Sequence, residues 1–376
     1  MYLTLCLTRD CNLRCGYCYA GRKFARAMEW DVARRAIDLG MVETLAQAGK
    51  TGREPKMILG FFGGEPLLEW DLLRRCDDYA SQCAEQLGIH MRHTLTTNLT
   101  LVTPDKSAWL HRHKYHLGLS LDGCAAMHNT WRKYASGEKS HGDCLQGLEY
   151  VKELSGDWAE IIMVVDPRQV GYLSESVRFL GGISPYGIVV NCNFSADWSE
   201  EACSTMNREF DHMGELWLNW FREGTPRRIN VIDSKIKTHL CGGYHEKDHC
   251  KMGETELTVS VNGNFYPCER LVGDDDREEL CFGNVFTGFD IARRLSIIMS
   301  RGNRTETCQS CPVKERCVNW CGCSNYASTG RLDEVSPFMC FHERLSMKVA
   351  DRVGGILWEE KNPLFINLFY GNLKEG

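Results

Sequence analysis

The stretch CNLRCGYC, residues 11–18, indicates the fold class because it sets three cysteines at the spacing C-x3-C-x2-C, just after a β-rich run at 2–8. This spacing differs from the cysteine run of ferredoxins and from the paired CxxC of zinc ribbons. A four-iron cluster held only by Cys11, Cys15 and Cys18 keeps one iron open, as a catalytic metal site keeps a coordination position open. The stretch therefore predicts an iron–sulfur site with room for a ligand. A three-cysteine zinc site or chance clustering is the alternative.

The composition of the chain is that of a globular protein. It has 376 residues, 43% of them apolar and 25% charged, enough for two domains or for one large domain with an appendage. The formal net charge of -6 argues against a mainly electrostatic nucleic-acid binder. We find no apolar run of membrane-spanning length and no export signal, so we expect a cytoplasmic protein without a membrane partner. In a reducing compartment, twenty cysteines indicate metal ligation or redox chemistry.

Short β-rich runs alternate with amphipathic stretches up to about residue 225, which predicts repeated βα units and a parallel sheet. Six units are fewer than the eight of a closed barrel, so the expected fold class is α/β, a partial (β/α)6 TIM-like barrel with its chemistry at the C-terminal ends of the strands. We expect a helix at 29–47, a solvated acidic loop at 274–279 and a closing helix at 341–360. The strands are expected at 2–8, 56–62, 92–97, 116–121, 160–165 and 187–194.

We expect the chain to divide in sequence order. The barrel takes 1–225, a bridging segment 226–249, a Cys-rich domain 250–345, and a C-terminal helix and tail 346–376.

A second motif, Gly63-Gly64-Glu65-Pro66, follows the second expected strand, and its glycines let backbone groups approach a ligand closely. Together with the cysteine triple, it resembles the radical S-adenosylmethionine (SAM) superfamily. The resemblance implies that SAM chelates the open iron of a [4Fe-4S] cluster through its amino and carboxylate groups. It also implies that one-electron reduction cleaves SAM to a 5'-deoxyadenosyl radical, which abstracts hydrogen from the substrate.

The same resemblance implies further SAM contacts at the strand ends. Glu65 and its glycines would bind the methionine amino group, Ser120 the ribose and Arg132 the methionine carboxylate, to which a guanidinium is well matched. Asn98 and Asp122 lie in matching motifs, and each either contacts SAM or caps a turn.

The C-terminal region holds a second group of cysteines whose spacing resembles the SPASM extension of radical SAM peptide and protein maturases. The resemblance implies two auxiliary [4Fe-4S] clusters, hence three clusters in all. The first would take Cys241, Cys250, Cys268 and Cys321, and the second Cys308, Cys311, Cys317 and Cys340.

Some of these assignments have alternatives. Cys241 lies further from Cys250 than we expect, so the first auxiliary cluster could instead have an open iron that binds a substrate thiolate. Cys281 and Cys323 have no assigned role, and either could substitute for a ligand. A zinc-binding domain is the other interpretation of the pair Cys308 and Cys311.

Glu269 directly follows Cys268. In sulfatase-maturing relatives the matching position is an Asp that looks like a general base beside the substrate. We therefore expect Glu269 to take the proton lost when a substrate radical is oxidised. The alternative is an ordinary surface carboxylate.

The predicted function is that of a radical SAM oxidoreductase acting on a ribosomally synthesised peptide, on which it forms a thioether or carbon–carbon crosslink or carries out a related oxidation. We expect the peptide to be recognised at the barrel mouth or by a separate partner protein, because little chain precedes the first strand. An external one-electron reductant of the flavodoxin or ferredoxin type is also expected. One alternative is anaerobic sulfatase maturation, which makes formylglycine from Cys or Ser. Another is an iron–sulfur electron carrier, which would not need Gly63 to Pro66.

Overall fold

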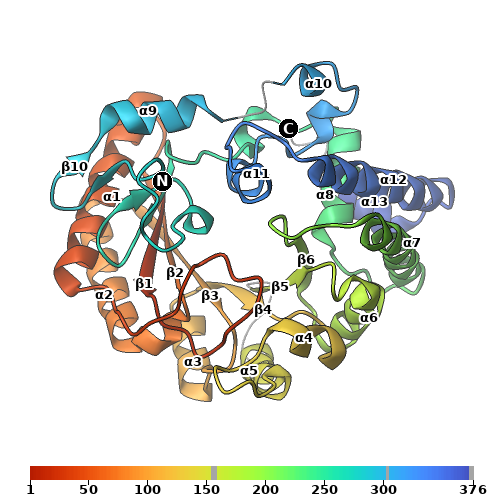
Figure 1. The fold of residues 1–376 in the computed structure, drawn as a ribbon, viewed down its shortest axis with the longest axis horizontal. Helices are drawn as coiled ribbons and strands as arrows, with labels where there is room; N and C mark the ends of the chain where they lie inside the picture. The colour runs from red at the N-terminus through yellow and green to blue at the C-terminus, as the bar shows by residue number, and fades with distance from the viewer. Residues whose placement is uncertain (154–158, 302–304, 372–376) are drawn as a thin grey trace. The chain divides into compact units, whose positions relative to one another are not determined.

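The computed structural model describes residues 1–153, 159–301 and 305–371, and Figure 1 follows the chain from red to blue. The chain divides into two compact units, each assembled from separate stretches of sequence. Unit 1 comprises Met1–Ser120, Arg132–Ala159 and Cys250–Arg301; unit 2 comprises Leu121–Trp131, Glu160–His249 and Gly302–Gly376. In the described residues, no helix combines the length and the apolar character that crossing a membrane requires.

Unit 1 is built on a mostly parallel sheet with the strand order β4-β3-β2-β1-β7-β8. β1 is central, pairs in parallel with β2 and β7, and is buried over nearly all its length, as expected for a strand covered on both faces. β7 and the short β8 are antiparallel. The strands are β1 (Tyr2–Thr8), β2 (Lys56–Gly63), β3 (His90–Thr97), β4 (His116–Ser120), β7 (Glu256–Val259) and β8 (Phe265–Tyr266).

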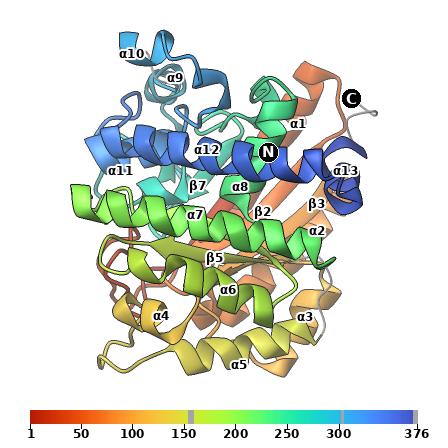
Figure 2. The same cartoon turned by 90° about the vertical axis from the view of Figure 1, so that its right-hand side faces the viewer.

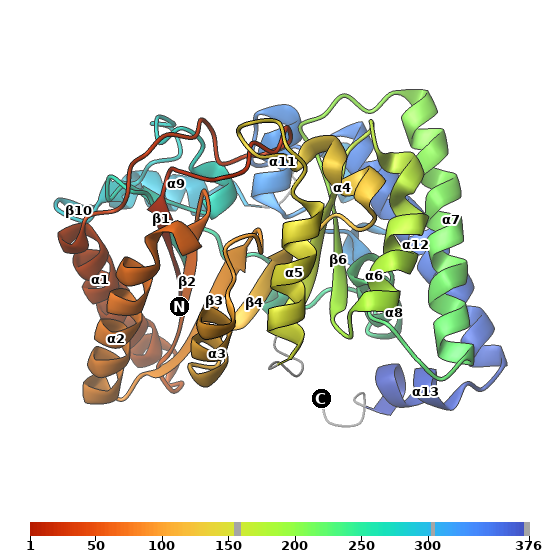
Figure 3. The ribbon, with the colours of Figure 1, turned by 90° about the horizontal axis from the view of Figure 1, so that it is seen from below.

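Helices line the outer side of these strands, as Figure 3 shows for α1 (Trp30–Thr51), α2 (Trp70–Leu87) and α3 (Pro104–Arg112). α1 and α2 both end at a glycine in the left-handed conformation, Gly52 and Gly88, which is a common helix stop. The N-cap of α3 is Thr103, whose side chain accepts a hydrogen bond from the Lys106 N–H. These stops and starts return the chain to the sheet, so the loops that follow β1, β2 and β3 gather at one edge.

The remaining elements of unit 1 are helix α5 and several short helices, strands and turns. These are α5 (His141–Lys152), β9 (Gly283–Asn284), β10 (Gly288–Phe289), α9 (Ile291–Met299) and the 3-10 turns η1 (Pro66–Glu69) and η4 (Glu269–Leu271).

Unit 2 is mainly helical around the parallel pair β5 (Ala159–Val165) and β6 (Gly187–Cys192). Its longest helices, α7 (Glu200–Arg222) and α12 (Pro337–Glu359), run side by side in Figure 2, and α12 also packs on α8 (Asn230–Leu240). Trp217 and Phe221 of α7 contact Phe365 of α13 (Pro363–Tyr370) in an aromatic core. The other elements are α4 (Ala125–Trp131), α6 (Leu173–Ile183), α10 (Glu306–Gln309), α11 (Gly322–Thr329) and the turns η2 (Val170–Tyr172), η3 (Glu246–Asp248) and η5 (Lys314–Arg316).

All six predicted strands are present, with boundaries shifted by no more than two residues. The expected strand at 187–194 ends early because the Asn193 side chain accepts a hydrogen bond from the Ser195 N–H and turns the chain. The helix expected at 29–47 is α1. The closing helix expected at 341–360 is α12, which begins earlier, after the cap residue Ser336, and ends at Glu359.

Candidate active site

The three cysteines of the first motif lie in the loop between β1 and α1. This loop is held by the segment that follows α4: Leu13 forms a β-bridge with Tyr134, and the Arg14 N–H donates to the Lys133 carbonyl at 2.7 Å. The three cysteines range from buried for Cys11 through half-buried for Cys15 to exposed for Cys18. The loop therefore presents its thiols at the carboxyl end of the central strand.

The surroundings of Cys11 suit a metal-bound thiolate. Its sulfur accepts hydrogen bonds from the Leu13 N–H at 3.4 Å and from the Asn98 amide at 3.7 Å. Burial raises the pKa of the Cys11 thiol to about 12, and the negative charges of Glu65, Cys15 and Cys18 act in the same direction. A thiolate at this place therefore needs a compensating positive charge, which iron supplies.

The described residues contain no set of three His, Cys, Asp or Glu side chains arranged around one metal ion. In a four-iron cluster each thiolate binds a different iron, so its ligands are spread more widely than those of one ion. The thiols of the loop, with two donors directed at the Cys11 sulfur, fit such a cluster.

The glycine motif packs directly against this loop. A Cβ atom on Gly64 would lie 1.8 Å from the Asp10 carbonyl oxygen, and Gly63 has a φ of 132°. The N–H groups of Gly64 and Glu65 donate to the carbonyls of Thr8 and Asp10, each at 2.9 Å. Both positions require glycine because backbone occupies the space that a side chain would take.

The Glu65 side chain is buried and bonded to the protein. Its Oε1 accepts from the Leu67 N–H at 3.0 Å and the Thr97 hydroxyl at 2.8 Å, and its Oε2 accepts from the Asn98 N–H at 2.7 Å. Burial raises its pKa to about 7 despite these hydrogen bonds. The carboxylate thus fixes the end of β3 to the glycine motif. Its contact with SAM stays a prediction.

The side chains of Asn98 and Asp122 both accept hydrogen bonds from backbone N–H groups. The Asn98 side chain accepts from the Thr100 N–H at 3.0 Å, which caps a turn, and it donates to Asn12 Oδ1 at 2.8 Å as well as to Cys11. Asp122, in unit 2, accepts from the Val164 N–H at 2.9 Å. For both residues the turn or backbone role is observed, and in unit 1 Asn98 also orients the cysteine loop.

Ser120 and Arg132, the other two residues expected to contact SAM, both lie in unit 1. Ser120 is half-buried at the last position of β4. Arg132 is buried, and its guanidinium lies 5.5 Å from the centre of the Tyr17 ring, inside the cysteine motif. Arg132 therefore lies beside the cysteine loop. Ser120 lies at the carboxyl end of β4, as the resemblance implies.

Glu269 lines a narrow crevice with the glycine motif. The crevice in unit 1 is bounded by Thr8, Gly63 and Gly64 on one side and by Glu269 with Gly273 on the other. The Cys268 thiol donates to Glu269 Oε2 at 3.5 Å. Glu269 is half-buried beside the glycine motif, and its role as a base stays a prediction.

An ion pair that the sequence did not suggest connects the two sides of this crevice. The buried Arg9 pairs with Asp274 at 2.9 Å and also donates to the Gly273 carbonyl. The Arg22 N–H donates to Asp274 Oδ1 at 2.6 Å, and this hydrogen bond, with the nearby Arg charges, lowers the pKa of Asp274. The prediction of a solvated acidic loop at 274–279 is wrong for Asp274, because it faces the cysteine loop.

The predicted auxiliary ligands are distributed over both units. Of the first set, Cys250 and Cys268 belong to unit 1, whereas Cys241 and Cys321 belong to unit 2. The whole second set belongs to unit 2, where Cys340 lies near enough to Cys308 and Cys311 for their charges to raise its pKa, although burial is the larger cause. The unassigned Cys323 has its sulfur 3.5 Å from that of Cys321, and Cys281 donates to the Gly283 carbonyl at 3.5 Å.

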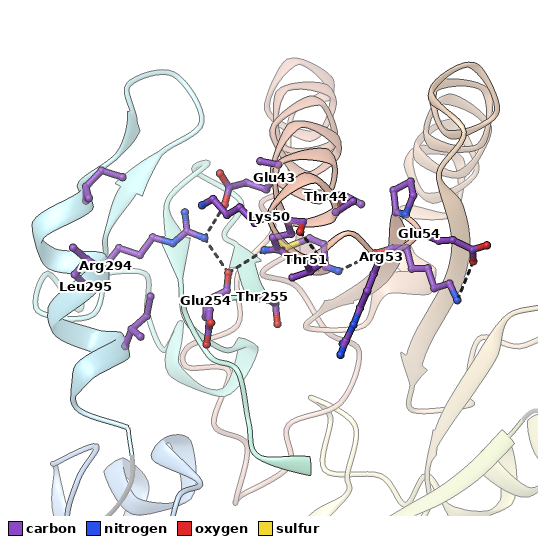
Figure 4. A pocket seen from close by; sticks show the side chains of 18 residues that line it. Glu43, Thr44, Lys50, Thr51, Arg53, Glu54, Glu254, Thr255, Arg294 and Leu295 are labelled. Atoms are coloured by element: carbon purple, nitrogen blue, oxygen red, sulfur yellow. Dashed lines mark hydrogen bonds and ion pairs between the residues drawn. The ribbon is translucent and has the colours of Figure 1, made fainter. Parts of the chain in front are cut away.

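A much larger cavity lies at the opposite end of the strands. Figure 4 shows this pocket of about 970 Å³ in unit 1, between the end of α1, the first residue of β2 and helix α9. Arg294 crosses it to pair with Glu43 at 2.8 Å. None of the predicted site residues lines this pocket, so its large volume does not identify it as the active site.

The cysteine loop, the glycine motif and the strand-end residues fall within one family match. A model of the radical SAM superfamily matches residues 5–180, a range that includes Cys11, Gly64, Asn98 and Arg132. Residues 5–180 belong to the radical SAM superfamily. The resemblance seen in the sequence is thus confirmed.

Curated relatives of this chain include maturation enzymes. It is 22% identical over 336 residues to the cysteine-type anaerobic sulfatase-maturating enzyme of Clostridium novyi, covering 83% of this chain and 85% of that protein. It is 29% identical over 179 residues to the uncharacterised protein MJ0907 of Methanocaldococcus jannaschii, covering 48% of this chain and 58% of that protein.

Solved structures confirm the predicted fold class. Native anSMEcpe with bound AdoMet and Kp18Cys peptide has a TM-score of 0.74 at 17% identity, covering 99% of this chain and 100% of that one. Streptococcus suis SuiB bound to precursor peptide SuiA has a TM-score of 0.57 at 16% identity, covering 90% and 75%. The radical SAM partial barrel followed by a Cys-rich region is therefore the architecture of this chain.

Proposed function

We propose that this radical SAM enzyme oxidises one residue of a peptide substrate and so installs a post-translational modification. The observation that carries the proposal is the position of Glu269, which lies in the same crevice as Gly63 and Gly64 and next to Cys268. When bound, SAM and its cluster supply the radical that removes a hydrogen atom from the substrate. The substrate radical must then lose one electron and one proton, and Glu269 is the base for that proton.

The thiols have distinct roles in this proposal. Cys11, Cys15 and Cys18 hold the SAM-binding cluster, with Arg132, Asn98 and the glycine motif around it. The ligand sets expected from the sequence would hold two auxiliary clusters, which would supply an acceptor for the electron that the substrate radical loses. An external flavodoxin- or ferredoxin-type reductant supplies the electron that starts each turnover.

The proposed product is a thioether or carbon–carbon crosslink within the peptide. A chain of the same fold, SuiB, was solved with a precursor peptide, which supports a peptide substrate. Formylglycine formation is the second candidate, because the sulfatase-maturating relative is matched over most of both chains. A crosslink removes two hydrogens, whereas formylglycine made from Cys loses two hydrogens and the sulfur and gains an oxygen. Formylglycine made from Ser also loses two hydrogens, so peptide fragmentation separates it from a crosslink by locating the change on one residue instead of two.

The test is mass spectrometry of candidate peptides after anaerobic incubation with reconstituted enzyme, SAM and reductant. We expect Glu269→Gln to slow product formation about 10²- to 10⁴-fold, the usual contribution of a general base. SAM cleavage should continue in this variant, because the base acts after hydrogen abstraction. Glu269→Asp should retain part of the activity, since it keeps the carboxylate.

Glu278→Gln is the matched control, since Glu278 is an exposed carboxylate in the same region, and its product formation should equal that of the wild type. Unchanged product formation in Glu269→Gln would remove Glu269 from the mechanism.

A further inference from the structure

A buried ion pair joins two helices of unit 2. Lys235 of α8 lies 2.7 Å from Glu343 of α12, and the two side chains are only 3% and 5% exposed. Taking two charges out of water costs several kcal/mol for each ion, and the cost is recovered only with good geometry and additional hydrogen bonds. The additional bonds of this pair show what it holds in place.

Those bonds lie on either side of Cys317. The Lys235 ammonium donates to the Arg316 carbonyl at 2.8 Å, and the Val318 N–H donates to Glu343 Oε2 at 2.8 Å. The residues before and after Cys317 are therefore each fixed by one member of the pair.

The helix that carries Glu343 also carries Cys340. Cys340, Glu343 and Arg344 occupy positions i, i+3 and i+4 of α12, which share one face of a helix. Arg344 donates to the sulfur of Cys311 at 3.4 Å. One helical face therefore provides one predicted cluster ligand and side chains that contact the segments of two others.

The positive charge of Lys235 is needed beside Glu343 when Cys317 is a thiolate. A buried carboxylate beside a thiolate at Cys317 would repel it, and the Lys235 ammonium at 2.7 Å offsets this repulsion. Removal of Lys235 alone would leave the buried Glu343 with only His342, whose Nδ1 lies 3.7 Å from its Oε1, and removing one partner of a buried pair is more costly than removing both charges.

We propose that Lys235 and Glu343 are positioning residues of the second auxiliary site: they hold the Cys317 segment against the face of α12 that carries Cys340. The inference rests on the proposed function, in which Cys308, Cys311, Cys317 and Cys340 bind one [4Fe-4S] cluster.

The experiment counts iron and sulfide in the full-length, anaerobically reconstituted protein and records its EPR spectrum after reduction. The variants are Glu343→Gln, Lys235→Met and the double variant Lys235→Met/Glu343→Leu, which replaces both members of the pair by apolar side chains. Each folded variant should lose about four irons and the same EPR component that Cys317→Ala loses. Lys235→Arg should keep the full iron content, since it keeps the charge.

Glu360→Gln is the matched control. Glu360 follows α12 and pairs with Arg222 at the surface, so this variant should keep wild-type iron and EPR spectra. Full iron content with unchanged spectra in the folded Lys235 and Glu343 variants would overturn the positioning role while leaving the cluster assignment intact. A wild-type protein with only about four irons would instead overturn the auxiliary-cluster assignment and, with it, this inference.

Discussion

Glu65 joins the ends of β2 and β3 through its carboxylate. Both oxygens accept hydrogen bonds, among them those from Thr97 and Asn98, and the side chain is only 1% exposed. Asn98 in turn donates to the sulfur of Cys11. A single buried acid therefore orders the residue that touches the first cluster ligand, and its protonation state affects the stability of the fold.

The folded-state pKa of Glu65 is about 7, above its ordinary value of 4.5, so the folded protein binds this proton more tightly than the unfolded chain. The contribution of Glu65 to stability is therefore full below pH 4.5 and is lost as the pH rises through 7. The loss amounts to about 3 kcal/mol. The side chain introduced in Glu65→Gln cannot titrate. Its NH2 group would face the Asn98 N–H, and the loss of this hydrogen bond costs about 1–3 kcal/mol.

We expect the melting-temperature gap between the wild type and Glu65→Gln to narrow between pH 5 and pH 8. The exposed Glu85→Gln in α2 should follow the wild type at each pH. Parallel pH profiles for wild type and Glu65→Gln would contradict the titration of Glu65.

At the scale of elements, the loop after β1 and the turn after β2 fit together backbone to backbone. Gly64→Ala should force Asp10 and the cysteine loop apart, because a Cβ atom would overlap the Asp10 carbonyl. Such strain costs about 1–3 kcal/mol. We therefore expect SAM affinity, measured by calorimetry on the reconstituted protein, to fall about tenfold or more.

Gly49→Ala is the control, because nothing lies within 4 Å of the added atom and alanine favours the helix by about 0.5–1 kcal/mol. Its SAM affinity should be unchanged. Wild-type affinity in Gly64→Ala would show that this close contact does not shape the site.

The sequence predicted strands β1 to β6 and the principal motifs because these have local signals: β-rich runs, cysteine spacing and paired glycines. β7 was not predicted as a neighbour of β1, because the pairing of Tyr2 with Glu256 has no local signal. The Arg9–Asp274 pair escaped for the same reason, since its members are 265 residues apart. The backbone role of Glu65 depends on hydrogen bonds that appear only once β2 and β3 lie side by side.

At the scale of the whole molecule, the candidate ligands are shared between two compact units that each combine distant stretches of sequence. The proposed function requires three clusters, and the reconstituted wild type should therefore bind about twelve irons. Cys308→Ala or Cys340→Ala should lower this number to about eight, because these cysteines share one cluster. Cys203→Ala, in a cysteine outside every ligand set, should keep about twelve, and a similar loss there would show that iron content reports folding instead of ligation.

The most direct measurement of the central claim is the formation of 5'-deoxyadenosine from SAM by the anaerobically reconstituted, reduced protein. Cys15 lies in the loop whose three thiols are proposed to hold the SAM-binding cluster. We predict that the wild type produces 5'-deoxyadenosine and that Cys15→Ala produces none while keeping its auxiliary clusters. Formation of 5'-deoxyadenosine at the wild-type rate by Cys15→Ala would contradict the account.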